Sequence, residues 1–544
     1  MRLYARLTRM SLVVLLGIAL VTAHAAAADS DQIGQVHFPT SCSAEAQTHF
    51  DRAVALLHSF WFPEAIKAFN TVLETDPSCS MGYWGIAMSL LGNPLGGPPT
   101  PQALQEGERT LRQAKPVGVR TEREYAYLQA IALFYKDVQA TDQRTRALAY
   151  EQAMERLAAR YPDDPEAAIF YALALNITAQ PTDKTYANQL KAAAILEKIF
   201  AQQPNHPGVA HYLIHSYDYP PIAAKGLSAA RQYASIAPSA PHALHMPSHI
   251  FTRLGLWQES IETNRASATV ARDELRAPQP VGAGSYHALH AMDYMMYGHL
   301  QLAQDQAARR ILDEILAIHK IDVEQFGAAY ALVAIPVRYA LERRRWEEAS
   351  TLQLHPKNLA WDRFPQAEAV TVFARGLGAA RSGKVAAAQQ DVARLQVLRD
   401  ALVTSGQQYW ADQTEMQRQV VSAWLARAAG KKEEAVKLMR AAATLEDSTE
   451  KHPVTPGPIV PARELLGELL LELNQPALAL QAFEASHRVE PDRFKGLYGA
   501  ARAADLAGQK EKARMFYTKL VIMCEKADHE RPELVEAVMF LAQQ

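Results

Sequence analysis

The chain has 544 residues, 49% of them hydrophobic, and is therefore long enough to bury a large core. Its formal net charge of −2 leaves no basic excess for a nucleic-acid backbone or an anionic membrane surface, so we expect no nucleic-acid partner. Ala, Leu, Glu, Gln and Arg are abundant, and no sustained alternation of β-branched residues points to a sheet. This composition predicts an all-α fold.

Residues 1–28 have the features of a signal peptide. Three arginines precede an apolar run over 11–21, and small residues from Ala23 to Ala28 follow that run. The run is too short to cross a bilayer comfortably, no other segment approaches twenty uninterrupted apolar residues, and no cysteine follows the small residues. We therefore expect a soluble exported protein, periplasmic or secreted, with no membrane span and no lipoprotein anchor.

Two of the three cysteines lie just before predicted helices, Cys42 before one near Ala44 and Cys79 before one near Met81. Their separation of 37 residues is close to the length of one helical repeat, so the edges of neighbouring repeats could bring them together. Because disulfides persist in oxidising compartments, we predict a Cys42–Cys79 disulfide. The alternative is a pair of ordinary buried thiols, and Cys524 has no partner in either case.

A pattern of small, aromatic and proline residues marks the repeats themselves. Near the N-terminus, Ala65 is followed by Phe69 and then by Pro77. The C-terminal part carries a fuller version, formed by Leu466, Gly467, Leu470, Ala479, Phe483 and Pro491, and then by Ala513 and Tyr517 one period later. A small residue lets two antiparallel helices approach, the aromatic ring fills the space beside it, and proline ends the second helix.

This pattern resembles the tetratricopeptide repeat (TPR) superfamily, as found in exported bacterial TPR-containing proteins. The resemblance implies an α-solenoid of stacked antiparallel helix pairs with a concave groove, which usually binds a protein or peptide partner. We expect TPR-like repeats with a histidine-rich groove over 29–330, further repeats over 331–446, a proline-rich linker over 447–461 and a C-terminal TPR pair over 462–544. Pro165, Pro207 and Pro241 are expected to begin successive first helices, and short turns are expected near Gly255, Gly298, Arg345 and Gly430.

Histidines are concentrated in one part of this array, since nine of the 18 lie between His206 and His299. His211 and His245 are 34 residues apart, and so are His215 and His249. In the TPR register counted from Pro207 and Pro241, the groove-lining positions 2, 5, 9 and 12 of the first helices would be occupied by His211, His215, Asp218, His242, His245 and His249. A third helix repeats the motif with His287, His290 and Asp293, but its register falls about two positions later.

Neutral imidazoles together with a carboxylate are the ligand set of transition metals, and two histidines four residues apart on a helix can chelate one ion. The candidate metal ligands are His211, His215, His242, His245, His249, His287, His290 and Asp293, with zinc or copper favoured and iron or nickel also possible. Asp218, Arg253, Tyr212, Tyr286 and Tyr294 are candidates for ligand binding or for orienting the imidazoles. Pro247 is expected to bend its helix at the ligands, or to mark a helix that begins late.

Three functions remain open on the sequence alone. The groove could bind a transition metal or a small or peptide ligand, it could belong to a periplasmic metalloenzyme that activates water or oxygen, or the chain could be a metal-free interaction scaffold. Histidines kept only for hydrogen bonds across the helices are the structural alternative. No hydrolase elbow, phosphate-binding loop, H-E-x-x-H or C-x-x-C motif is present, so the enzyme interpretation depends on the histidines. The sequence indicates neither the metal nor the oligomeric state.

Overall fold

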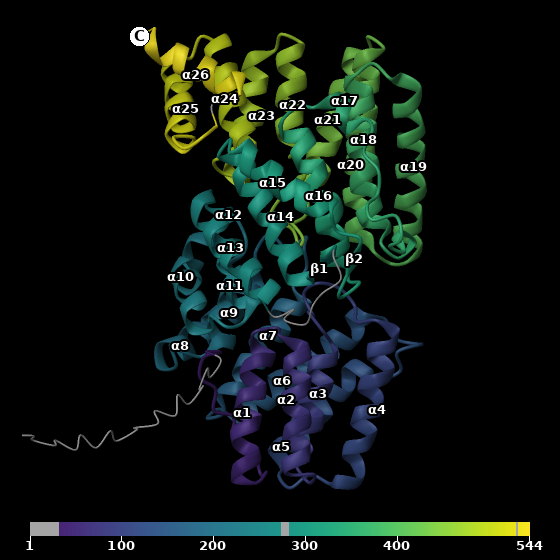
Figure 1. Cartoon of the computed structure of the whole chain (residues 1–544), viewed down its shortest axis with the longest axis vertical. Coiled ribbons are helices and arrows are strands. Elements are labelled where there is room, and N and C mark those ends of the chain that lie inside the picture. Colours follow the sequence, from purple (N-terminus) through teal and green to yellow (C-terminus); the bar gives the residue numbers. More distant parts are fainter. Residues whose placement is uncertain (1–31, 274–281, 529–530, 544) are drawn as a thin grey trace, which may run out of the picture. The chain divides into compact units, whose positions relative to one another are not determined.

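Helices make up nearly all the regular structure in the computed structural model, which describes residues 32–273, 282–528 and 531–543 (Figure 1). Most of them pack chiefly against their neighbours in sequence, so the chain forms successive helix pairs. The all-α, TPR-like prediction is thereby confirmed. The predicted signal peptide at 1–28 lies outside the described residues.

The helices are numbered in chain order in Figure 1. The first eight are α1 (Ala44–His58), α2 (Phe62–Thr75), α3 (Ser80–Leu90), α4 (Pro101–Val117), α5 (Glu122–Ala132), α6 (Gln143–Arg160), α7 (Pro165–Thr178) and α8 (Ala187–Gln202), with the 3-10 turn η1 (Leu133–Tyr135). The next are α9 (Pro207–Tyr217), η2 (Ala223–Gly226), α10 (Leu227–Ile236), α11 (Pro241–His245), α12 (Pro247–Arg253), α13 (Trp257–Asp273), α14 (Tyr286–Gln301) and α15 (Asp305–Leu316).

The remaining helices are α16 (Phe326–Glu342), α17 (Trp346–Ala349), η3 (Trp361–Arg363), α18 (Pro365–Arg381), α19 (Val385–Thr404), α20 (Gln408–Ala428), α21 (Lys432–Asp447), α22 (Ala462–Glu472), α23 (Pro476–Val489), α24 (Phe494–Leu506), α25 (Lys510–Met523) and α26 (Pro532–Ala542). Two short strands, β1 (Ala283–Gly284) and β2 (Lys320–Ile321), pair in parallel. No helix within the described ranges has the length and apolarity needed to cross a membrane.

Local sequence explains where these helices begin and how closely they pack. Pro165, Pro207 and Pro241 each occupy the first turn of a helix, as predicted, where a missing N–H leaves no bond unmade. At the C-terminal pairs, a Cβ added at Gly467 or Gly499 would overlap the ring of Phe483. The small residues therefore let three helices close around one aromatic ring, which is the packing that the repeat pattern predicts.

The turn predicted over 298–303 lies at the end of this stretch, at Leu302 and Ala303, because α14 continues through Gly298 to Gln301. A Cβ at Gly298 would lie 2.8 Å from the Ile261 side chain on α13. This glycine therefore serves the close approach of two helices, and the turn follows it.

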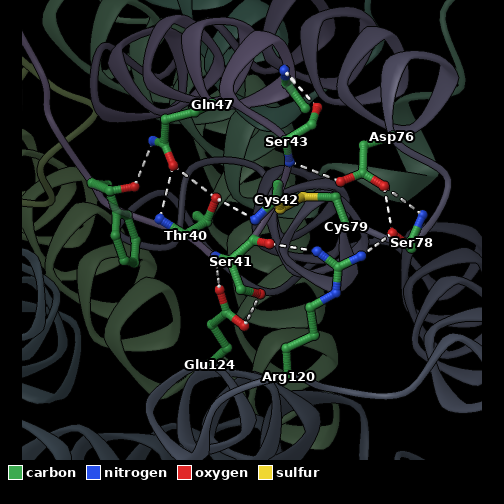
Figure 2. The surroundings of a disulfide bond; sticks show 12 residues. Thr40, Ser41, Cys42, Ser43, Gln47, Asp76, Ser78, Cys79, Arg120 and Glu124 are labelled. Atoms are coloured by element: carbon green, nitrogen blue, oxygen red, sulfur yellow. Dashed lines mark hydrogen bonds between the residues drawn. A yellow bond between two sulfur atoms is a disulfide. The ribbon is translucent and has the colours of Figure 1, made fainter.

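The predicted disulfide between Cys42 and Cys79 is present, with Cα atoms 4.9 Å apart (Figure 2). Cys42 lies two residues before the start of α1, and Cys79 lies immediately before α3. Around it, the Ser43 N–H donates to Asp76, and Arg120 donates to the Ser41 carbonyl. The bond therefore ties the N-terminal edges of two neighbouring repeats.

Residues 448–461, most of the predicted linker, pack against helices that are distant in sequence. Glu450 accepts hydrogen bonds from Lys184 and Tyr186, and Lys451 donates to Asp218. Arg338 donates to the carbonyls of Gly457 and Pro458. Residues 32–544 form one compact unit, and the division of this unit at residues 330, 446 and 461 stays a prediction.

Candidate metal centre

Four helices of the array, α9, α11, α12 and α14, carry the clustered histidines. His211 and His215 lie one turn apart on α9, His242 and His245 on α11, His249 on α12, and His290 on α14. Met246 and Pro247 separate α11 from α12, so the predicted interruption at Pro247 occurs between His245 and His249. His242 of α11 therefore lies next to the histidines of α9, and His245 of α11 lies next to those of α12 and α14.

These histidines are buried in the interior rather than exposed on an open groove, which corrects the expectation from the TPR register. His211, His245 and His249 are 0–2% exposed, and His215, His242 and His290 are 6–7% exposed. Phe60 stacks on His242 with a centroid distance of 5.4 Å, and Thr455 in the 448–461 segment contacts Tyr294 beside His249. Both contacts come from segments far away in sequence, so the repeat register alone could not reveal this burial.

His245, His249 and His290 form the first histidine triad, in which one ring nitrogen of each residue lies within 4.8 Å of the others. The Nε2 atoms of His245 and His249 are 3.0 Å apart. Imidazole nitrogens bind zinc at about 2.0–2.1 Å, so two ligands of a tetrahedral ion lie about 3.3 Å apart. The observed separation is close to that of two nitrogens that share one ion.

Hydrogen bonds on the outer side of the His245 and His249 rings fix which nitrogen of each ring carries the proton. The Nδ2 of Asn264 donates to the Ser260 carbonyl, so the Asn264 Oδ1 faces the His245 Nδ1 at 2.7 Å and accepts a hydrogen bond from it. His249 Nδ1 donates to the Asp218 carboxylate at 2.9 Å. Both protons are therefore on Nδ1, and two Nε2 lone pairs face each other. Only a proton or a cation between them relieves this contact.

Burial favours a cation over an extra proton. It lowers the pKa of His245 well below its ordinary value of 6.5, and nearby His290 and His249 lower it further. It also lowers the pKa of His249 against the opposing effect of Asp218, and it lowers the pKa of His290 to about 3. At neutral pH these rings are neutral, which is the form that coordinates metal.

His211, His215 and His242 form the second histidine triad. His211 Nδ1 donates to the His58 carbonyl at 2.6 Å, so its Nε2 carries only a lone pair. That Nε2 lies 3.1 Å from His215 Nε2 and 3.2 Å from His242 Nε2. One lone pair cannot accept a linear hydrogen bond from both neighbours, so this triad also presents nitrogens suited to a cation. Burial lowers the pKa of His211 to about 3.

Two cationic side chains, Lys451 and Arg253, keep the carboxyl group of Asp218 ionised, and this carboxylate orients His249. Burial alone would raise the Asp218 pKa, but Lys451 and Arg253 hold it below its ordinary value, helped by the bond from His249. Lys451 donates to Asp218 at 2.7 Å and Arg253 at 3.0 Å. Arg253 also contacts Glu490 at 3.3 Å and is 3% exposed, so it is part of a buried network rather than a solvated side chain.

The other candidates lie around the triads. Asp293 accepts a bond from Arg338 at 2.9 Å and belongs to neither triad, and His287 is half-buried, 6.4 Å from the His242 ring. Tyr286 packs on His287 with a centroid distance of 5.2 Å. Tyr294 bonds to the Thr455 carbonyl at 3.2 Å and lies 3.4 Å from His249 Nε2.

A third group of metal-ligating side chains, His58, Glu166 and His206, was missed by the sequence analysis. Both histidines bond to Glu166 through Nε2, at 2.9 and 2.8 Å. His206 Nδ1 accepts from the Val209 N–H, and His58 Nδ1 lies 3.0 Å from the Tyr212 hydroxyl, which places Tyr212 in this group. Nothing in the local sequence around His58, Glu166, Asn264 or Lys451 marks their roles.

A cavity of about 690 Å³ lies next to the Asp218 network, because Arg253 and Lys451 are part of its wall. Aromatic side chains of Tyr330, Tyr409 and Trp410 line it as well. The cavity has the size of a small-molecule site. Two of its wall residues contact Asp218, which bonds to His249, so it is connected to the first histidine triad through one carboxylate.

No family model and no curated protein matches the chain. Among solved structures, the human IFIT1 dimer with PPP-AAAA has 12% identity and a TM-score of 0.38, covering 91% of this chain and 99% of that one. An IFIT1 monomeric mutant with Gppp-AAAA has 11% identity and a TM-score of 0.34, covering 91% and 99%. Naa15/Naa10 bound to HypK-THB has 10% identity and a TM-score of 0.24, covering 92% and 91%. At this level these proteins say nothing about the histidines.

Proposed function

We propose that the chain binds a first-row transition-metal ion, zinc or copper, through its buried histidine cluster. The contact between His245 Nε2 and His249 Nε2 carries this proposal. These atoms are 3.0 Å apart, and both rings carry their protons on Nδ1, where they donate hydrogen bonds to Asn264 and Asp218. The protein supplies neutral, oriented ligands that are shielded from water, with a carboxylate behind one of them.

The donor set narrows the class of metal. Each triad offers only imidazole nitrogens, which suit zinc, copper, nickel and iron but not magnesium or calcium. No thiolate takes part, because Cys42 and Cys79 are bonded to each other and Cys524 is buried elsewhere, 3.7 Å from the Gln301 carbonyl. Zinc and copper are our first candidates, and elemental analysis would also detect iron and nickel.

Elemental analysis of untagged, full-length protein tests this function. We expect at least one equivalent of a transition metal in the wild type, and about one equivalent less in the double variant His245→Gln/His249→Gln. His299→Gln is the matched control, because His299 is also buried on α14 but bonds to Gln304 and belongs to neither triad. Wild-type protein that contains no metal and takes up neither zinc nor copper would contradict the proposal.

The cavity beside Asp218 favours a second candidate, a metalloenzyme or small-molecule sensor. Its occupant would contact Arg253 and Lys451, and through Asp218 it would influence His249. Such a function needs a coordination position open to an exchangeable ligand. Azide added to the Cu(II) form should then produce a new charge-transfer band, whereas an unchanged spectrum would favour a closed carrier site.

We also infer export to an oxidising compartment, which the Cys42–Cys79 disulfide supports. Sequencing of the N-terminus of the native protein should find the mature chain beginning near Asp29. A chain that retains Met1 and contains a reduced Cys42 would contradict export. Binding of a protein or peptide partner stays an expectation of the repeat fold.

A further inference from the structure

The two histidine triads are constructed by the same rule. In each, one pair of histidines is four residues apart in sequence, and a third histidine comes from a following helix. His242 on α11 completes the pair His211 and His215, and His290 on α14 completes the pair His245 and His249. The pairs are 34 residues apart, so the second pair repeats the first along the array, whereas the third histidines do not follow this period.

The triads lie side by side but remain separate groups. The ring centroids of His215 and His249 are 5.6 Å apart, and those of His242 and His245 are 5.8 Å apart. One octahedral ion with six imidazoles would bring all six nitrogens within about 4.2 Å of each other, given metal–nitrogen bonds of about 2.1 Å. The nitrogens instead form two groups of three, so one ion cannot use all six.

Charge decides which ions fit such a pair. All six ligands are neutral, and the carboxylate behind His249 is already balanced by Lys451 and Arg253. Two divalent ions would place four uncompensated positive charges in the interior, whereas two monovalent ions would place two. Among metals that imidazole binds, copper has a stable monovalent state that accepts three ligands.

The second triad is also shielded from water by an aromatic side chain, which agrees with a monovalent copper ion at this position. Phe60 packs against all three rings, with centroid distances of 4.4 Å to His211, 5.4 Å to His242 and 6.2 Å to His215. Its φ of 52° is in the left-handed region, which is unfavourable for a non-glycine residue. Tertiary contacts therefore hold this aromatic ring against the three imidazoles and help to shield them from water.

We propose that the chain holds two adjacent copper ions, one in each histidine triad. This inference rests on the proposed metal-binding function and adds a second ion and the identity of both. His211, His215 and His242 would bind one copper, and His245, His249 and His290 the other.

Anaerobic titration of the metal-free, full-length protein with Cu(I), against a competing chelator, tests the pair. We expect two copper ions in the wild type, one in His215→Gln/His242→Gln, one in His245→Gln/His249→Gln and two in the control His299→Gln. X-ray absorption at the copper edge should show about three nitrogen neighbours per ion. Helical content by circular dichroism is checked for each variant, and the single variants His215→Gln and His249→Gln replace any double variant that unfolds.

The outcomes separate this inference from the function on which it rests. One copper in the wild type, lost in only one of the double variants, would contradict the proposal of two copper ions but would leave the proposed metal binding intact. Uptake of two zinc ions but no copper would overturn the copper assignment. No uptake of any metal would overturn both proposals.

Discussion

Three buried groups of metal-ligating residues lie in the described part of the chain, and comparing the group of His58, Glu166 and His206 with the first histidine triad shows what separates them. In the group of His58, Glu166 and His206, each histidine can donate one proton to Glu166, and its other nitrogen has a partner in Tyr212 or the Val209 N–H. In the first histidine triad, the protons of His245 and His249 point outward and their Nε2 lone pairs point inward. Ligand atoms are close together in both groups, so the placement of the hydrogens is what distinguishes the proposed metal site.

Metal removal should produce the largest difference between these groups. A ligand present at a thousandfold its dissociation constant stabilises the folded state by about 4 kcal/mol. Removal of an ion from the first triad by a chelator should therefore lower the free energy of unfolding of the wild type by about that amount, and the total effect should be smaller by this amount in His245→Gln/His249→Gln. Chemical denaturation with and without chelator measures both. Equal shifts in the two proteins would mean that the metal binds elsewhere.

The Glu166 group should respond to loss of its carboxylate instead. Glu166→Gln leaves one acceptor for two buried N–H donors and should cost about 3 kcal/mol of stability, with metal content unchanged. Burial alone would raise the Glu166 pKa, but His58 and His206 outweigh it and lower the pKa from 4.5 to about 2.

A lowered carboxyl pKa gives stability that is present above pH 4.5 and is lost as the pH falls toward 2. The stability difference between wild type and Glu166→Gln should therefore shrink over that range, as measured by denaturation at several pH values. Loss of metal in Glu166→Gln, without loss of helical content, would instead assign Glu166 to a metal site.

Asp218→Asn tests the orientation of His249. The amide can no longer serve as a purely accepting partner, so the His249 proton can move to Nε2 and block the lone pair. Metal affinity should fall about tenfold to a hundredfold. Asp293→Asn is the matched control, because Asp293 is a buried carboxylate paired with Arg338 outside both triads. A comparable loss in this control would restore Asp293 as a ligand, as the sequence suggested.

Tyr294→Phe should have the smallest effect. The hydroxyl lies 3.4 Å from His249 Nε2 and closer, at 3.2 Å, to the Thr455 carbonyl, which can take its proton. Removing it should change metal affinity by less than about threefold, because so long a contact is weak. Competition with a chromophoric chelator is sensitive enough to tell this from the effect of Asp218→Asn.

The sequence predicts the part of the centre that follows the repeat. His211, His215, His245 and His249 were found from their 34-residue register, and the disulfide from its position before two helices. Asn264 and Lys451 were not found from the sequence, because each contributes one polar atom from a segment whose packing the repeat register does not specify. For the same reason the sequence placed the histidines on an open groove, whereas they are buried.

The span of these contacts sets the order in which the molecule is assembled. The His58 carbonyl holds His211 across 153 residues, and Lys451 reaches Asp218 across 233 residues. A chain that has folded only through α14 has all six histidines and Arg253, but lacks Lys451, the second cation that holds the Asp218 carboxylate behind His249. On the proposed function, tight metal binding therefore requires the C-terminal part of the fold, although all the ligands lie before it.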